Sequence, residues 1–363
     1  MKSSIPTQPR PVSPAESASR LSARWKSFGA FALLAVALPL LAFVVMHLFV
    51  FTNYTGDVFH EEGFVTQYSS GIYRYRVLGR ELLLLTHEVV RAFVPEAPLS
   101  LPRDPQATWP FYCSYLLVNG LFAIATSVAF YTLTFVRKDE PRDIDLAAYL
   151  CFLLVSAISY SAVTPYDQMS YFFLAASFLA TRNENQWAAH LGLAVVTVLG
   201  LLTRETQALF TPAICTTARF GDRRLRRRRL WAGAFHLIVF AVCYLGLRFH
   251  YGFEHGLIHS VPSRSWKHFA SLLFWPPLFV LAWFFALRKV RDPRIAALFF
   301  GLSLPYSLTI AVSGLYAEFR LLVPLILCLL VVYSEIERDR LAAVHSASLS
   351  LPSPSSQRPA RAA

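Results

Sequence analysis

Long apolar runs recur along nearly the whole chain, and they constrain its fold more than any other feature. An α-helix rises about 1.5 Å per residue, so roughly 20 apolar residues cross the hydrocarbon layer of a bilayer. Of the 363 residues, 55% are hydrophobic and only 15% are charged. A water-soluble fold cannot bury that much apolar surface. The sequence therefore predicts an all-α, polytopic transmembrane helical bundle.

Charged or proline-containing loops divide the apolar runs into about ten predicted spans. The pairs within 146–181 and 188–218 are short, so each forms either a helical hairpin or one long helix, and we favour hairpins, with Pro165 breaking the first. Turns of such short hairpins would lie below the outer surface, which predicts a cavity. The spans lie near 28–51, 110–136, 146–164, 170–181, 188–202, 206–218, 230–248, 267–287, 295–313 and 321–333.

Positive charges predict the orientation, because cytoplasmic loops of membrane proteins carry an excess of Lys and Arg. With the N-terminus in the cytoplasm, 24 of the 34 Lys and Arg residues lie inside, seven of them between Arg219 and Arg229. The expected location is therefore a bacterial inner membrane with both termini cytoplasmic. The predicted organisation is a disordered tail at 1–27, a transmembrane domain at 28–333 with a long extracytoplasmic loop at 53–109, and a second tail at 334–363.

The net charge of +12 does not predict a nucleic-acid partner, because the basic residues sit in short loops between apolar runs. The Arg223–Arg229 run is better explained by anionic membrane lipids. The cysteines lie in or beside apolar runs without CxxC spacing or arranged histidines, so we predict no disulfide and no structural zinc. They are Cys113, Cys151, Cys215, Cys243 and Cys328.

The predicted outer loop begins with acidic residues and continues with alternating Tyr and Arg. Asp57 follows the first span, Glu61 and Glu62 come next, and Arg74 and Arg76 each follow a tyrosine. Carboxylates accept protons from hydroxyl groups and guanidinium forks bind phosphate oxygens, so the set suits a sugar and phosphate site. Glu61 and Glu62 fit a solvated loop equally well.

Further along this loop, residues 80–94 predict a helix lying in the outer interface. Its charged residues share an arc of roughly 120° on a helical wheel, with leucines and valines opposite. They are Arg80, Glu81, His87, Glu88 and Arg91.

Three later outer turns also carry charge. Asp167 follows Pro165 and Tyr166, and is either a functional carboxylate or a helix N-cap. Arg204 and Glu205 lie between two short spans, where they face a cavity or satisfy other helices. Glu318 and Arg320 precede the last span and are either site residues or interfacial anchors.

Together these features resemble the GT-C class of polytopic glycosyltransferases, which use polyprenyl-phosphate sugars. The resemblance lies in an acidic residue after the first span, an outer interfacial helix, and an Asp and an Arg-Glu pair at later outer turns, and it covers most of 28–333. Many such enzymes carry paired acidic residues right after the first span, whereas here Asp57 stands alone until Glu61 and Glu62.

The resemblance implies an inverting transfer of a sugar at the extracytoplasmic face. Asp57 would take the proton from the acceptor hydroxyl, and Asp167 would orient the acceptor or a divalent cation. Arg204, with Arg320 or Arg74, would stabilise the leaving lipid phosphate, and Glu205 would hold Arg204. Arg76 and Glu318 complete the expected site, and no metal ligand set is predicted.

The main alternative is a transporter or flippase for an anionic amphiphile, since Arg and Asp lining a membrane cavity suit one as well. A transporter needs access from both sides. The charged residues, however, gather at the predicted outer face, and the inner halves of the spans carry none. One-sided polarity favours an enzyme.

Overall fold

The computed structural model describes residues 28–47, 58–99, 104–135, 143–160, 164–181, 186–211, 223–253, 306 and 323–333. Every regular element in these ranges is a helix, and an isolated bridge pairs Pro98 with Thr108. The predicted helical class is thus confirmed for this part of the chain. The predicted tails, the span at 267–287 and all of the span at 295–313 except Tyr306 lie outside the described residues.

Four of the described helices are long and apolar enough to cross a membrane, which indicates an integral membrane protein. They are Phe28–Val45, Trp109–Phe135, Gln186–Thr203 and Trp231–Tyr251. Two shorter apolar helices, Asp145–Ser159 and Val323–Tyr333, accompany them. The expected number of about ten spans is not confirmed by these residues.

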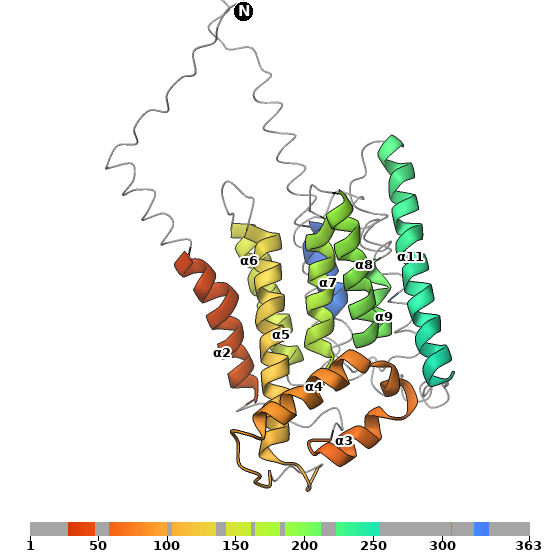
Figure 1. The fold of residues 1–363 in the computed structure, drawn as a ribbon. Coiled ribbons are helices and arrows are strands. Elements are labelled where there is room, and N and C mark those ends of the chain that lie inside the picture. Colours follow the sequence, from red (N-terminus) through yellow and green to blue (C-terminus); the bar gives the residue numbers. More distant parts are fainter. Residues whose placement is uncertain are drawn as a thin grey trace, which may run out of the picture.

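The long helices stand side by side in a bundle, and two short ones lie across one end of it (Figure 1). The upright elements are η1 (Ala32–Ala37) with α2 (Leu38–Val45), α5 (Trp109–Phe135), α6 (Asp143–Ser159), α7 (Asp167–Thr181), α8 (Gln186–Thr203) and α11 (Arg223–Tyr251). The elements at the end are α3 (Glu61–Tyr68), η3 (Gly71–Tyr75) and α4 (Val77–Val90), with α9 (Glu205–Ala208) following α8.

Packing runs through the bundle from α5 outwards. Helix α5 packs against α2, α4, α6 and α7, then α7 packs against α8, and α8 against α11. Aromatic side chains fill the contacts, as where the rings of Phe130 and Phe152 stack with centroids 4.4 Å apart. Residues 323–333 are buried throughout and belong to the same hydrophobic core. Such a helix, apolar on all sides, forms the centre of a bundle.

Both short pairs of predicted spans are broken, as the hairpin interpretation requires. In the first, α6 ends at Ser159 and α7 begins at Asp167. In the second, α8 ends at Thr203, and a Cβ placed on Gly200 would lie 3.9 Å from the Cβ of Ala208. Eight residues of continuous helix would separate these positions by about 12 Å. The chain therefore turns back after Arg204.

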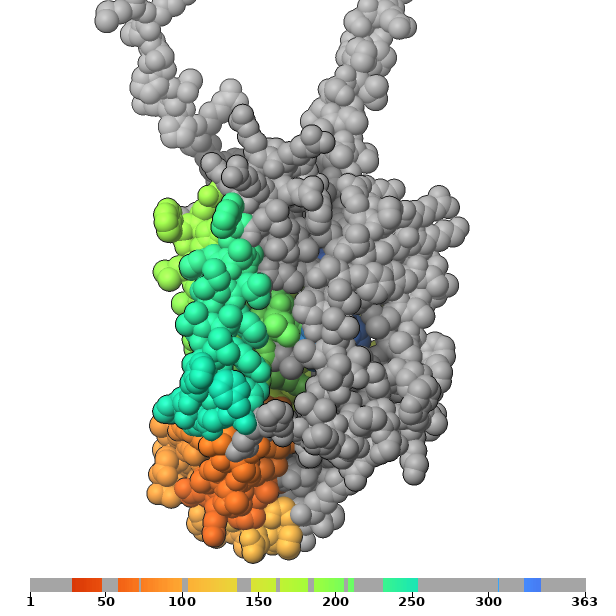
Figure 2. Space-filling view, turned by 90° about the vertical axis from the view of Figure 1, so that its right-hand side faces the viewer, coloured from red at the N-terminus to blue at the C-terminus, as the bar shows by residue number. Residues whose placement is uncertain are grey.

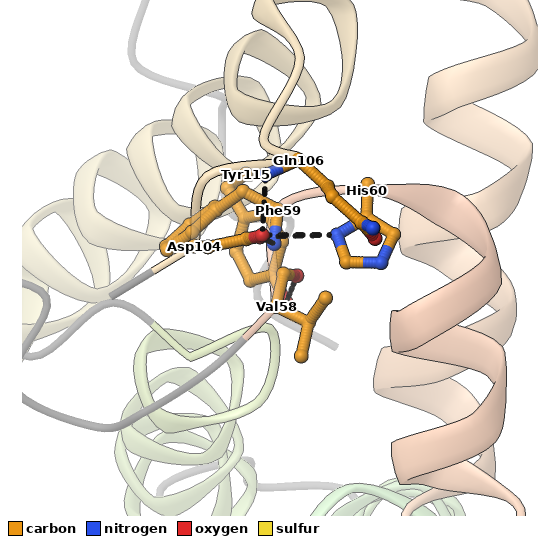
Figure 3. A network of polar contacts seen from close by, with 6 residues as sticks. All are labelled: Val58, Phe59, His60, Asp104, Gln106 and Tyr115. Carbon is orange, nitrogen blue, oxygen red and sulfur yellow. Dashed lines mark hydrogen bonds and ion pairs between the residues drawn. The ribbon is translucent and has the colours of Figure 1, made fainter. Parts of the chain in front are cut away.

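The loop predicted to lie outside is closed at its base by Asp104, a residue that sequence reasoning missed (Figure 3). Its carboxylate accepts the Phe59 N–H at 2.6 Å and the Gln106 N–H at 3.1 Å, and lies 3.1 Å from Nδ1 of His60. The N–H of Thr108 also donates to the carbonyl of Phe59 at 2.9 Å. The Asp-Pro dipeptide at 104–105 signals such a side-chain-to-backbone turn.

Helix α4 confirms the predicted helix, but one residue of its charged arc is not on the polar side. His87 is 3% exposed and its ring packs edge-on against Phe111, with centroids 4.8 Å apart. The buried positions of α4 are Gly79, Leu83, His87 and Val90. His87 faces the bundle because it falls on the edge of the arc nearest this stripe.

We predict that Gly79→Ala destabilises the protein by about 1–3 kcal/mol through overpacking. An added Cβ would lie 3.2 Å from the carbonyl oxygen of Pro165 and 3.3 Å from Cβ of Tyr166, so α4 must move off this turn. Thermal unfolding in detergent measures the effect. Gly246→Ala in α11 is the matched control, because its Cβ would meet nothing within 4 Å. Equal melting temperatures for both variants would contradict the prediction.

Candidate functional site

The carboxylate of Asp167, in the first turn of α7, contacts Arg204 at the end of α8. The backbone N–H of Asp167 donates to Oγ1 of Thr164 at 3.2 Å, so Thr164 caps the helix, with Pro165 following it. Asp167 is the first residue of α7. Its side chain accepts a hydrogen bond from Arg204, with 2.5 Å between Nη1 and Oδ1.

This ion pair between Asp167 and Arg204 is buried, with side-chain exposures of 2% and 8%. Arg204 ends α8, and its backbone N–H still donates to the carbonyl of Gly200 at 2.7 Å. Burying two charges is costly unless they pair closely, so the contact fixes the start of α7 against the end of α8. Two turns that are 37 residues apart in sequence thus meet at one point.

A second ion pair joins α9 to α11. Oε2 of Glu205 lies 2.8 Å from Nη2 of Arg248, and the Arg248 guanidinium lies 3.7 Å from the ring centroid of Tyr75. The Tyr75 hydroxyl in turn donates to the carbonyl of Gly252. The expectation that Glu205 holds Arg204 is wrong: each carboxylate pairs with the arginine of a different helix.

Arg248 is not among the predicted site residues, because it ends the apolar run at 230–248 and a basic residue there only indicates the end of a span. The sequence around Arg248 does indicate a site, because Tyr244 and Tyr251 lie four residues before it and three after it, on the same helical face. Its guanidinium is 5.1 Å from the ring centroid of Tyr244. An arginine among tyrosines at the predicted outer end of a span, where basic residues are rare, is a site candidate.

Arg76 lies between these two ion pairs and is held by aromatic rings. Its guanidinium carbon is 3.9 Å from the ring centroid of Tyr166 and 4.8 Å from that of Tyr73. It forms no ion pair with a carboxylate of the described residues, and its Nη1 is buried without a hydrogen-bond acceptor. A buried guanidinium N–H that lacks an acceptor is ready to bind an anion.

We call this set the arginine cluster, and among the described residues its guanidiniums outnumber its carboxylates. Arg74 joins it, with its guanidinium 5.9 Å from the ring centroid of Tyr251. Among described residues four guanidiniums stand beside two carboxylates. Figure 2 shows the lower end of α11 meeting the segment that contains η3, the contact at which Arg248 lies beside Tyr75. The cluster consists of Arg74, Arg76, Arg204 and Arg248 with Asp167 and Glu205.

The remaining predicted residues are either outside the described part of the chain or away from the cluster. Asp57, Glu318 and Arg320 lie outside the described residues. Glu61 and Glu62 occupy the exposed first turn of α3, and Oε2 of Glu61 lies 3.8 Å from Nε2 of the buried His87. Neither carboxylate pairs with an arginine of the cluster. Of the eight predicted site residues, the structure therefore brings Arg74, Arg76, Asp167, Arg204 and Glu205 together.

Burial raises the pKa of Glu205 above its ordinary value of 4.5, although Arg248 and then Arg76 act in the opposite direction. A carboxyl group with a raised pKa in the folded state binds its proton more tightly there than in the unfolded state. The free energy of unfolding therefore falls as pH rises from 4.5 through the raised pKa.

We predict that Glu205→Gln flattens this pH dependence, because the neutral amide resembles the protonated carboxyl group at every pH. Melting temperatures of both proteins over pH 4 to 8 measure it. Glu81→Gln, which removes a half-exposed carboxylate from α4, is the control and should keep the wild-type slope. An unchanged slope in Glu205→Gln would rule out Glu205 as its source.

No group of three or more His, Cys, Asp or Glu side chains in the described ranges is arranged to hold a metal ion. The buried N–H of Arg76 that lacks an acceptor supports the binding of an anion by guanidiniums. Comparison with protein-family models, curated proteins and solved structures gave no match to this chain.

Proposed function

We propose that this protein is a membrane glycosyltransferase that transfers a sugar from a polyprenyl-phosphate donor to an envelope glycan, lipid or protein acceptor. The observation that carries the proposal is Arg76, whose guanidinium is held between Tyr73 and Tyr166 with a buried N–H free to bind an acceptor. It belongs to the arginine cluster, at one end of apolar, membrane-length helices. A lipid-linked phosphate combines an anionic head with an apolar tail, which suits this position.

The proposed reaction is an inverting substitution at the anomeric carbon of the donor sugar. The acceptor hydroxyl oxygen forms a bond to that carbon as the bond to the phosphate oxygen breaks, and the electron pair leaves with the polyprenyl phosphate. The acceptor proton passes to a carboxylate, for which Asp57 remains our candidate because of its place after the first span.

The cluster would stabilise the charge that develops on the leaving phosphate. Arg76 contributes an N–H without an internal acceptor, while Arg204 and Arg248 are oriented by Asp167 and Glu205. Guanidiniums already in place need no reorganisation during the reaction, which is how such groups lower a barrier. Asp167 and Glu205 are therefore positioning residues in this proposal. A divalent cation is not required by it.

The location in the proposal is the extracytoplasmic face of a bacterial inner membrane, with both termini in the cytoplasm. The excess of Lys and Arg in the opposite loops supports this orientation. Reporter fusions after Arg182 and after Thr206 test it. A cytoplasmic signal at Arg182 and an external one at Thr206 are expected, and the reverse pattern would overturn the orientation.

Mass spectrometry of envelope glycans and lipids from cells with and without the gene tests the function. The loss of one sugar residue from an envelope component is expected on deletion, with restoration by the wild-type gene. An unchanged glycan and lipid profile would contradict the proposal. Accumulation of a donor lipid on the cytoplasmic side would instead support a flippase.

We expect Asp57→Asn to abolish transfer by purified protein supplied with a polyprenyl-phosphate sugar and its acceptor. The amide cannot accept the proton of the acceptor hydroxyl, and loss of such a base typically lowers a rate by about 10²–10⁴. Glu62→Gln, in the exposed first turn of α3, is the control with an expected wild-type rate. Equal turnover by Asp57→Asn and wild type would remove Asp57 as the base.

A further inference from the structure

Helix α4 has an exposed apolar face that its packing does not explain. Leu85 and Val89 are 64% and 56% exposed, and Phe93 in the following turn is 82% exposed. The three are spaced four residues apart, which places them on one side of a helix and of the turn that continues it. Single exposed leucines are ordinary, but three large apolar side chains in a row call for a partner.

Three faces of α4 have different surroundings, about 120° apart on the helix. Gly79, Leu83, His87 and Val90 form the face against the bundle. Arg80, Glu81, Glu88 and Arg91 form a second, where both ion pairs are between neighbours on α4 itself and Glu81 and Glu88 are more than half exposed. Leu85 and Val89 form the third. A helix packed on one side, charged on another and apolar on the last fits a boundary between protein, water and lipid.

The position of α4 places this boundary at the end of the membrane-length helices. Figure 1 shows α4 lying across the ends of the upright helices. Those helices expose apolar side chains along their length, including Leu117 and Leu121 on α5 and Ile238 and Val242 on α11, as expected of surfaces in contact with acyl chains. Trp109, 43% exposed at the start of α5, lies at the same end, and tryptophan is enriched at membrane interfaces.

We infer that the face of α4 formed by Leu85, Val89 and Phe93 inserts into the headgroup and acyl boundary of the membrane. Arg76 is the residue that precedes α4, so the same helix begins at the arginine cluster and ends in lipid. The inserted face thereby holds the guanidinium of Arg76 at headgroup depth. This contact with lipid does not depend on any reaction at the cluster.

Nitroxide labelling of full-length protein in liposomes tests the inference. In a background with the five native cysteines replaced, labels are attached at Leu85→Cys, Val89→Cys or Phe93→Cys, and at Glu81→Cys or Glu88→Cys as controls on the charged face of the same helix. Monodisperse elution of each labelled protein shows that it is folded. Collision rates with oxygen, which concentrates in lipid, and with a water-soluble nickel chelate are then measured.

We expect the oxygen-to-nickel accessibility ratio to be several-fold higher at 85, 89 and 93 than at 81 and 88. Equal ratios, with nickel reaching all five positions, would mean that the apolar face lies in water and would overturn the inference. Low accessibility to both reagents at 85, 89 and 93 would mean that protein covers the face, and would overturn it too. Dipolar broadening between labels would identify that covering protein as a second copy.

Discussion

Replacing Asp167 by alanine is expected to lower the free energy of unfolding by about 3–5 kcal/mol, because Arg204 keeps a buried charge and loses the carboxylate oxygen 2.5 Å away. An SDS titration in mixed micelles, followed by circular dichroism, measures the change. The effect should be large because both side chains are nearly inaccessible to water. Solvent cannot replace the lost partner.

The Arg80–Glu81 pair provides a control with similar geometry and different burial. Its atoms are 2.6 Å apart, but the Glu81 side chain is 57% exposed. Glu81→Ala should therefore cost about 0–1 kcal/mol, as exposed pairs do. The double variant Asp167→Ala with Arg204→Leu should lose less than the sum of its two single variants, since no charge is left unpaired. A loss at Asp167 no larger than at Glu81 would show that the buried pair does not hold α7 to α8.

Replacing Arg76 by glutamine should lower the rate of sugar transfer by about 10²–10³, the usual effect of removing one preorganised donor to a developing negative charge. Lysine should not restore the rate, because an ammonium lacks the planar fork that lies between the rings of Tyr73 and Tyr166. Radiolabelled donor and purified protein in liposomes give the measurement, with binding of a polyprenyl phosphate followed separately.

Arg80→Gln is the matched control, since Arg80 lies one helical turn along α4 and its guanidinium is already paired with Glu81. It should retain transfer within about twofold of wild type. Equal losses in the two variants would point to charge at this end of the bundle in general rather than to Arg76. A wild-type rate in Arg76→Gln, with folded protein, would remove the observation on which the proposed function rests.

The helical class and the meeting of charged turns were predictable from sequence because both follow from local pattern. Apolar runs of membrane length require helices, and charges at the ends of short hairpins gather on one side. Arg204 and Asp167 were found in this way. Their ion-pair partners were not predictable, because the pairing of carboxylates with arginines depends on how α7, α8 and α11 pack. Arg204 and Glu205 are neighbours in sequence, yet they pair with residues of different helices.

Two further residues show where local reasoning ends. His87 has a charge-bearing side chain on a helix with a clear polar face, yet it is buried against Phe111 because the bundle covers that edge of α4. Asp167 begins α7, and its carboxylate accepts a hydrogen bond from Arg204, a partner 37 residues away that the local Pro-Tyr-Asp pattern could not indicate. The outer cavity and the role of Asp57 stay predictions.

The hydrogen bonds among Phe59, Asp104 and Thr108 hold the two ends of the predicted outer loop together. Because Phe59 and Thr108 are hydrogen-bonded to each other and Asp104 fastens the same neck, the 45 or so residues between them begin and end at one place. The same segment also packs on the bundle through the buried face of α4, so it is fixed in two places, at the neck and along this helix. Arg74 and Arg76, which the segment supplies, are therefore held relative to the bundle from both sides, and a change at either place would shift them.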